Sequence, residues 1–238
     1  MDLNETKEAR ILPERMRILS GSVLKMIAIV AMLIDHTAHL FKIGADTVLF
    51  SLGDHTLTLY SLMRYVGRIA FPLFAFLLIE GFLHTKSRKK YAIRMALFAL
   101  VSEIPFNLFC SGSLFYGRQN VFFTLLLGLL AIWAWEACPK RLAAVIIIGL
   151  LGISVVLGAD YRYAGFVFIL LLYFLRSIPL MGAMMSGCIL SIASAASFLP
   201  IGLYNGKRGF IHNGVLKYLF YAFYPLHLLI LVLIKILL

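Results

Sequence analysis

The sequence predicts an all-α protein that crosses a lipid bilayer repeatedly, with about eight transmembrane helices in one polytopic bundle. Of its 238 residues, 62% are hydrophobic and 14% are charged, whereas a soluble domain is about 45–50% apolar and about 25% charged. The apolar residues form long runs, and a run of about 20 residues spans a bilayer as a helix. Helices satisfy their own backbone hydrogen bonds in lipid, so these runs predict helices rather than strands.

Short polar segments divide the apolar runs. Residues 1–20 are polar and basic, and they predict a cytoplasmic N-terminal arm before one transmembrane domain over 21–238. The arm lacks the pattern of a cleavable signal peptide, so we expect the first span to be an uncleaved anchor. We expect residues 42–58 to form a loop. The predicted spans cover about 22–41, 59–83, 91–110, 120–137, 142–158, 163–176, 178–200 and 214–237.

The distribution of basic residues predicts the topology. The formal charge is +11, and with eight spans most lysines and arginines fall on the side of both termini. Basic loops face the cytoplasm, so we expect both termini to be cytoplasmic in a multi-pass protein of the bacterial cytoplasmic membrane. This topology places Lys207 and Arg208 on the opposite side. The basic residues form no long basic face, which argues against a nucleic-acid partner.

The cysteines predict no metal or redox site. Cys110, Cys138 and Cys188 are scattered and show none of the spacings of a zinc site. We expect them to be small buried hydrophobic residues, and we expect no metal.

The first span contains three ionisable residues, Asp35, His36 and His39. A charged group at bilayer depth costs roughly 2.5–3.5 kcal/mol on insertion scales, and such groups are therefore usually functional. We predict that these residues form the chemical centre of a membrane enzyme. Two structural alternatives stay open: Asp35 and His39 could pair along one helix face, or Asp35 could form a salt bridge with Arg68.

Other spans carry polar residues that the predicted topology brings to a similar depth. We therefore expect Asp35, His36, Arg68 and Glu103 to share one cavity. Arg64 and Arg68 are like charges one helical turn apart, which predicts either an anion between them or acidic residues that face them. Glu80 and His84 are expected to pair near the inner surface. The further candidate binding residues are His39, Asn107, Asn120, Tyr204, Asn205, Lys207, Arg208, Tyr224 and His227.

Several stretches resemble the TraX family, and together they cover about residues 20–238. They are Ser22-X-Leu24-Lys25-X-Ile27-Ala28, Met32-X-Ile34-Asp35-His36, GRIAFPLFAF at 67–76, Glu80-Gly81, SEIPFN at 102–107, NVFFTL at 120–125, LYNGKRG at 203–209 and Tyr221-X-Phe223-Tyr224-Pro225-X-His227. The resemblance implies a membrane acetyltransferase related to the acyltransferase-type integral membrane enzymes. Such an enzyme takes the acetyl group from acetyl-CoA and delivers it to an extracytoplasmic peptide or glycan acceptor, such as the N-terminus of a pilin in conjugation or another cell-envelope component.

Acetyl transfer needs a base for the proton of the acceptor and donors for the developing oxyanion. We predict His36 as the base, with His39 as the alternative, and Asp35 as the acid that orients one of the two histidines. We predict Glu103 as a third catalytic residue. Arg64 and Arg68 would bind the pyrophosphate of CoA, and Lys207 and Arg208 would bind the adenosine phosphate or an anionic acceptor.

Two other classes of protein remain possible on the sequence. Intramembrane Asp, His and Arg residues could form the relay of a proton-coupled small-molecule transporter, although the chain shows no internal repeat. The chain could also be a non-catalytic assembly factor of an envelope or conjugation machine. Binding of labelled acetyl-CoA separates the enzyme from both.

Overall fold

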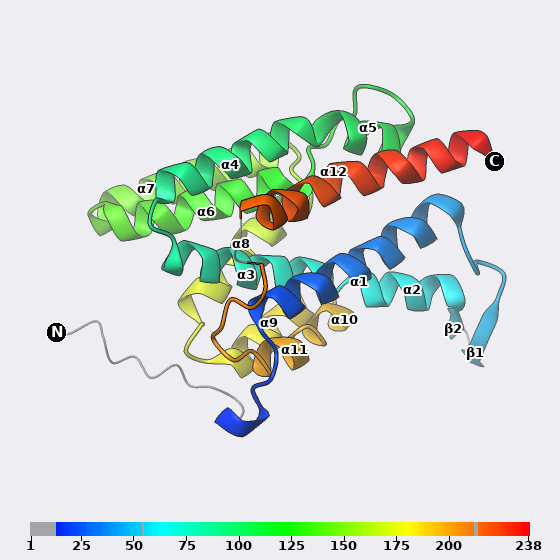
Figure 1. Ribbon diagram of the computed structural model, residues 1–238, viewed down its shortest axis with the longest axis horizontal. Coiled ribbons are helices and arrows are strands. Elements are labelled where there is room, and N and C mark those ends of the chain that lie inside the picture. Colours follow the sequence, from blue (N-terminus) through cyan, green and yellow to red (C-terminus); the bar gives the residue numbers. More distant parts are fainter. Residues whose placement is uncertain (1–12, 54, 212–213) are drawn as a thin grey trace.

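The computed structural model describes residues 13–53, 55–211 and 214–238, and most of the described chain is helical (Figure 1). Four segments are long and apolar enough to cross a membrane: Gly21–Phe41, Leu59–His84, Arg88–Ser111 and Gly214–Leu237. Shorter apolar helices cover Val121–Ala137, Arg162–Phe174 and Ile192–Gly202. The prediction of a helical membrane protein is therefore supported, and four of the eight predicted spans correspond to segments of full spanning length in the described chain.

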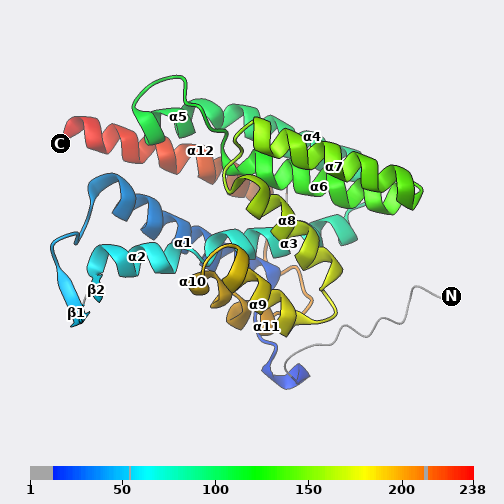
Figure 2. The same cartoon turned by 180° about the vertical axis from the view of Figure 1, so that it is seen from behind.

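The helices lie in three groups that both views of the molecule show (Figures 1 and 2). The middle group contains α1 (Gly21–Phe41), α2 (Leu59–Gly67) and α3 (Ala70–His84). Along one side lie α4 (Arg88–Val101), α5 (Glu103–Ser111), α6 (Val121–Ala137), α7 (Lys140–Val156) and α12 (Gly214–Leu237). On the other side lie α9 (Pro179–Ile189), α10 (Ile192–Ala195) and α11 (Phe198–Gly202), and α8 (Arg162–Phe174) connects the two sides. A short 3₁₀ helix, η1 (Glu14–Met16), precedes α1.

The predicted second and third spans are each interrupted once. The second breaks between α2 and α3, and the third breaks at Ser102 between α4 and α5. Pro72 and Pro105 each lie at the third position of the helix that follows the break. Proline lacks the backbone N–H of a helix interior but is tolerated in the first turn, so each proline favours a new helix start just before it.

The predicted seventh span, about 178–200, is wrong as a single helix. It forms three short helices that fold back on one another. Ser191 caps α10 by accepting a hydrogen bond from Ser194 N at 3.3 Å, and the hydroxyls of Ser186 and Ser194 lie 2.8 Å apart. Serine side chains compete for backbone hydrogen bonds and favour such breaks.

The loop after α11 returns to the start of α1, which corrects the predicted position of Lys207 and Arg208. Gly21 N donates to Lys207 O at 2.8 Å, and Ser22 N donates to Arg208 O at 2.9 Å. Both basic residues therefore lie at the end of the bundle where α1 begins, and not at the opposite end.

Helices α1 and α12 run in the same direction, and this contradicts the expectation of both termini on one side. Lys25 lies near Lys217 at their first turns, His36 contacts His227 midway, and His39 lies near Lys235 at their last turns. The end of α12 is therefore at the opposite end of the bundle from the start of α1 (Figure 1). The broken segment α9–α11, which makes no full crossing, accounts for the difference.

The predicted loop over 42–58 contains a β-hairpin. Strand β1 (Val48–Leu52) pairs antiparallel with β2 (His55–Thr58), with Leu52 opposite His55. Gly53 has φ of 56°, a conformation that glycine adopts without strain. The β-branched and aromatic residues of this segment favour a strand. The strands are short, so their pattern of apolar and polar residues does not stand out in a largely apolar sequence.

The predicted burial of the cysteines is also wrong in part. Cys110 and Cys188 are exposed, Cys138 is half-buried, and all three are free thiols. No group of three or more potential metal ligands occurs among the described residues.

Candidate functional site

Asp35 forms an ion pair with Arg64, and neither structural alternative from the sequence is the observed pairing. Arg64 Nη1 donates to Asp35 Oδ2 at 2.8 Å, with side chains only 22% and 15% exposed. The close approach of α1 to α2 requires a glycine, because a Cβ on Gly67 would lie 2.2 Å from Asp35 Cβ. Arg68 lies farther from this carboxylate and interacts with it through space. Arg64 therefore has an internal counterion and is not free to hold an anion with Arg68.

His36 forms a hydrogen bond with His227 across α1 and α12. His36 Nδ1 and His227 Nε2 lie 2.7 Å apart, and the two ring planes differ by 2°. His227 Nδ1 lies 2.8 Å from Phe223 O. His227 is 4% exposed, whereas His36 is half-buried. The structure thus pairs two of the predicted site residues, which lie 191 residues apart in the chain.

His39, the other predicted histidine, stands apart from this pair. Its Nδ1 is buried and has no hydrogen-bond partner in the described part of the chain. The ring contacts that of Phe109, with centroids 6.0 Å apart.

Glu103 and Asn120 form a third pair. Asn120 Nδ2 donates to Glu103 Oε2 at 2.6 Å and to Ala99 O at 2.8 Å, while its Oδ1 accepts from Phe122 N at 3.0 Å. Asn120 thereby caps α6 and ties it to the break between α4 and α5. This arrangement is a structural role for both residues, and it leaves Glu103 Oε1 buried without a hydrogen-bond partner in the described chain.

Asn107 has a structural role rather than the predicted binding role. Its Nδ2 donates to Leu114 O at 2.9 Å and so closes the turn after α5.

Arg68 lies beside Asp160 and Tyr161, two residues that fall between the predicted spans over 142–158 and 163–176. The Tyr161 ring stacks on Phe71 with centroids 4.1 Å apart, and its hydroxyl bonds to Arg68. Thr124 donates a hydrogen bond to the backbone oxygen of Asp160. Asp160 lies in the connection between α7 and α8, and burial raises the pKa of its carboxyl to about 6. Its position beside Arg68 depends on tertiary packing, which no local sequence signal shows.

The expectation of one cavity shared by Asp35, His36, Arg68 and Glu103 is therefore wrong. Each of the four residues pairs with a different neighbour. None of them lines the cavity that lies between α1, α3, α4, α6 and α12. The reason is that each buried polar group is satisfied locally across one helix contact, as buried polar groups require.

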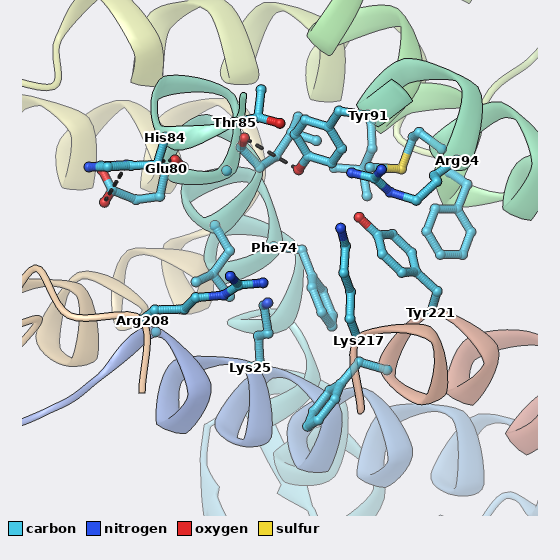
Figure 3. A pocket seen from close by; sticks show the side chains of 18 of the residues that line it. Lys25, Phe74, Glu80, His84, Thr85, Tyr91, Arg94, Arg208, Lys217 and Tyr221 are labelled. Carbon is cyan, nitrogen blue, oxygen red and sulfur yellow. Dashed lines mark hydrogen bonds and ion pairs between the residues drawn. The ribbon is translucent and has the colours of Figure 1, made fainter. Parts of the chain in front are cut away.

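A cavity of about 520 Å³ lies between α1, α3, α4, α6 and α12, close to the start of α1. Five lysines and arginines line it: Lys25 on α1, Lys86 between α3 and α4, Arg94 on α4, Lys217 on α12 and Arg208 on the returning loop. Figure 3 shows Lys25, Arg94, Lys217 and Arg208 around the cavity. Glu80 also lines it and lies 3.9 Å from His84 Nδ1. The described lining therefore holds five lysines and arginines against one carboxylate, that of Glu80, which is an excess of positive charge.

The cavity extends from these cations to an apolar inner part. Met32, Phe122, Leu125 and Tyr224 line that part. The Tyr224 ring contacts His227, with centroids 5.7 Å apart, and lies 6.4 Å from His36. The cavity thus approaches the histidine pair through Tyr224. Among the other predicted binding residues, Tyr204 lines the cavity, whereas Asn205 and Lys207 do not.

Of the five lysines and arginines of the cavity, the sequence analysis predicted only Arg208 and missed Lys25, Lys86, Arg94 and Lys217. A signal existed for Lys25, Arg94 and Lys217, because each lies within two turns of the beginning of an apolar helix, a position that snorkelling lysines and arginines often occupy. Only the return of residues 203–211 to α1 shows that these helix ends converge.

The fold is that of a helical protein with several helices that are apolar and long enough for a membrane, and with a cavity lined by cations. The profile of the family described as TraX protein matches residues 20–235, and the chain belongs to this family. The chain is also 31% identical to the probable fimbrial assembly protein FimC, serogroup H1, of Dichelobacter nodosus, over 89% of this chain and 94% of that protein. No solved structure matches the chain.

Proposed function

We propose that this protein is a membrane acyltransferase that moves an acetyl group from acetyl-CoA to an amine or hydroxyl group of a pilus, fimbrial or other cell-envelope component. One observation carries the proposal. The cavity has a cluster of lysines and arginines at one end and, at the other, a tyrosine in contact with the histidine pair. Membership of the TraX family and the name of the fimbrial relative support the link to surface appendages.

The shape and charge of the cavity fit a phosphate-bearing acyl thioester. Acetyl-CoA carries its phosphates at one end and its thioester at the end of a long arm. Lys25, Arg94, Arg208 and Lys217 suit the phosphates, and the apolar part suits the arm. The volume of about 520 Å³ falls within the range of about 300–1,000 Å³ that is usual for small-molecule sites. This assignment replaces Arg64 and Arg68 as the phosphate ligands, because Arg64 is paired with Asp35.

The position of the cavity also suits a cytoplasmic donor. Its cationic end lies where α1 begins, next to the basic segment that contains Lys86, Arg88, Lys89 and Lys90. Basic segments face the cytoplasm, so acetyl-CoA enters from that side of the bacterial cytoplasmic membrane. The acceptor approaches His36 from the other side.

In the proposed reaction the acceptor nitrogen or oxygen attacks the thioester carbonyl while His36 accepts the acceptor's proton. The carbon–sulfur bond then breaks, and His36 returns the proton to the leaving thiolate of CoA. General base catalysis of this kind contributes about 10²–10⁴-fold to a rate.

The test uses purified full-length protein in lipid nanodiscs, acetyl-CoA labelled in its acetyl group, and envelope material from a strain that lacks the gene. We expect label to pass to the envelope material with the wild-type protein and not with His36→Ala. Arg94→Gln should weaken acetyl-CoA binding, whereas Lys90→Gln should not. Lys90 is the matched control because it lies one turn earlier on α4, is exposed and does not line the cavity. Failure of the wild-type protein to bind acetyl-CoA would refute the proposal.

The name of the fimbrial relative favours a second candidate, a non-catalytic assembly factor. Such a protein would support appendage assembly without binding acetyl-CoA. A His36→Ala strain that assembles normal appendages would favour this candidate, and a strain that makes unacetylated ones would favour the enzyme.

A further inference from the structure

The hydrogen bonds of the histidine pair determine which ring nitrogens carry protons. A carbonyl oxygen can only accept, so the contact of 2.8 Å between His227 Nδ1 and Phe223 O requires a proton on Nδ1 of His227. In a neutral imidazole the other nitrogen is then an acceptor. His227 Nε2 therefore accepts, and the proton in the contact of 2.7 Å belongs to His36 Nδ1.

The ring geometry is that of a hydrogen bond in the ring plane. The centroids lie 5.0 Å apart with parallel planes, while the two nitrogens lie 2.7 Å apart. Rings stacked face to face would bring many atom pairs equally close. Here one nitrogen of each ring points at the other ring, so a lone pair of His227 meets the N–H of His36 directly.

A charged His227 would reverse this assignment, and its surroundings disfavour that state. The side chain is 4% exposed, and an unpaired charge in such a place is costly. The groups that interact electrostatically with His36 are His227, Arg64 and His39, and none is an acid. Asp35, the nearest carboxylate on the same helix, is paired with Arg64. A neutral His227 is therefore the state that the structure supports.

This assignment leaves Nε2 of His36 without a proton. No described residue forms a hydrogen bond with that nitrogen, and it is absent from the buried unpaired atoms of the described chain. His36 is half-buried and has Tyr224, a residue of the cavity lining, beside it. An acceptor's proton could thus reach Nε2 without any tautomer exchange.

We propose that His227 is the positioning residue of the site: it holds His36 in the Nδ1-protonated tautomer, so that His36 Nε2 is the proton acceptor of the acyl transfer. This inference rests on the proposed function. In catalytic triads an aspartate performs the same task by accepting from Nδ1–H of the histidine. Here a neutral imidazole takes that place, and Asp35 instead neutralises Arg64 near the ring that must become positive.

The first experiment observes the tautomers directly and does not depend on activity. Protein labelled with ¹⁵N in its six histidine rings is placed in nanodiscs at neutral pH, and His36→Gln and His227→Gln assign the two residues by loss of signal. We expect both rings to be neutral and protonated at Nδ1. A His36 ring protonated at Nε2 would overturn the inference even in an active enzyme.

The second experiment separates positioning from packing by kinetics. His227→Phe keeps a ring but removes the acceptor, and kcat should fall about a hundredfold with KM for acetyl-CoA unchanged. His227→Gln should recover much of the rate, because its side-chain oxygen can accept from Nδ1–H. Leu226→Phe is the control, since the neighbouring side chain is 51% exposed.

Two outcomes would overturn the positioning role. One is a His227→Phe protein with normal kcat, and the other is a folded His227→Gln protein no better than His227→Phe. If the wild-type protein shows the expected tautomers but transfers no acetyl group, the proposed function fails, and with it the catalytic role of His36.

Discussion

Asp35 on α1 and Gly67 at the end of α2 lie in direct contact, with no room for a side chain between them. A Cβ at position 67 would lie 2.2 Å from Asp35 Cβ and 2.3 Å from Asp35 Oδ1. These distances are far below van der Waals contact, so the backbone of α2 reaches α1 only through glycine. The contact brings Arg64, one turn earlier on α2, within 2.8 Å of the carboxylate.

We therefore expect Gly67→Ala to separate α1 from α2 and weaken the Asp35–Arg64 pair. Overpacking of this kind typically costs about 1–3 kcal/mol, which should lower the melting temperature in detergent by several degrees. Gly149→Ala is the control, because a Cβ at that position of α7 meets no atom within 4 Å. Equal melting temperatures for the two variants would show that α1 and α2 are not in this contact.

The ion pair itself gives a second prediction. Asp35→Leu and Arg64→Met each leave a largely buried charge without its partner, which costs about 3–5 kcal/mol. The double variant leaves no charge unpaired and should be more stable than either single variant. Melting temperatures of the four proteins, wild type included, form the test. A double variant that loses the sum of both single effects would mean that the two side chains do not interact.

Local sequence signals predicted the helices well and their meeting points poorly. The apolar runs and the cost of buried charge led to Asp35, His36 and His227, and the structure brings His36 and His227 together. The partner of Asp35 was not predictable, because Arg64 and Arg68 lie one turn apart and only the break before Pro72 decides which of them faces α1.

The return of the loop over 203–211 to α1 was also hidden in the sequence. Four of its hydrogen bonds to residues 19–22 join backbone atoms that lie more than 180 residues apart in the chain. The run over 178–200 is long and apolar enough to suggest a span, and the Ser186–Ser194 contact that folds it depends on tertiary packing. A single miscounted span then reverses the predicted side of every later segment.

The cavity cations give a third prediction, on ligand binding. Lys217→Gln and Lys25→Gln should each weaken acetyl-CoA binding about tenfold, because a hydrogen bond to a charged group contributes about 1.5–3 kcal/mol and 1.4 kcal/mol corresponds to tenfold. Added salt should weaken binding by the wild-type protein more than by the variants. Equilibrium binding of labelled acetyl-CoA in nanodiscs measures both effects. Unchanged affinity for acetyl-CoA in both variants would show that the cavity does not bind its phosphates.

The parallel course of α1 and α12 gives a fourth prediction, on topology. In a chain whose three cysteines are replaced by serine, Arg15→Cys and Lys207→Cys should react with a membrane-impermeant maleimide from one side of sealed vesicles. Phe50→Cys on β1 and Leu238→Cys should react from the other side. The reason is that residues 19–22 bind the loop over 203–211, whereas His39 lies near Lys235 at the far ends of α1 and α12. Labelling of positions 15 and 238 from the same side would mean that α12 runs antiparallel to α1. It would then also exclude the hydrogen bond between His36 and His227. The reason is that this contact, with Lys25 near Lys217 and His39 near Lys235, is consistent only with parallel helices.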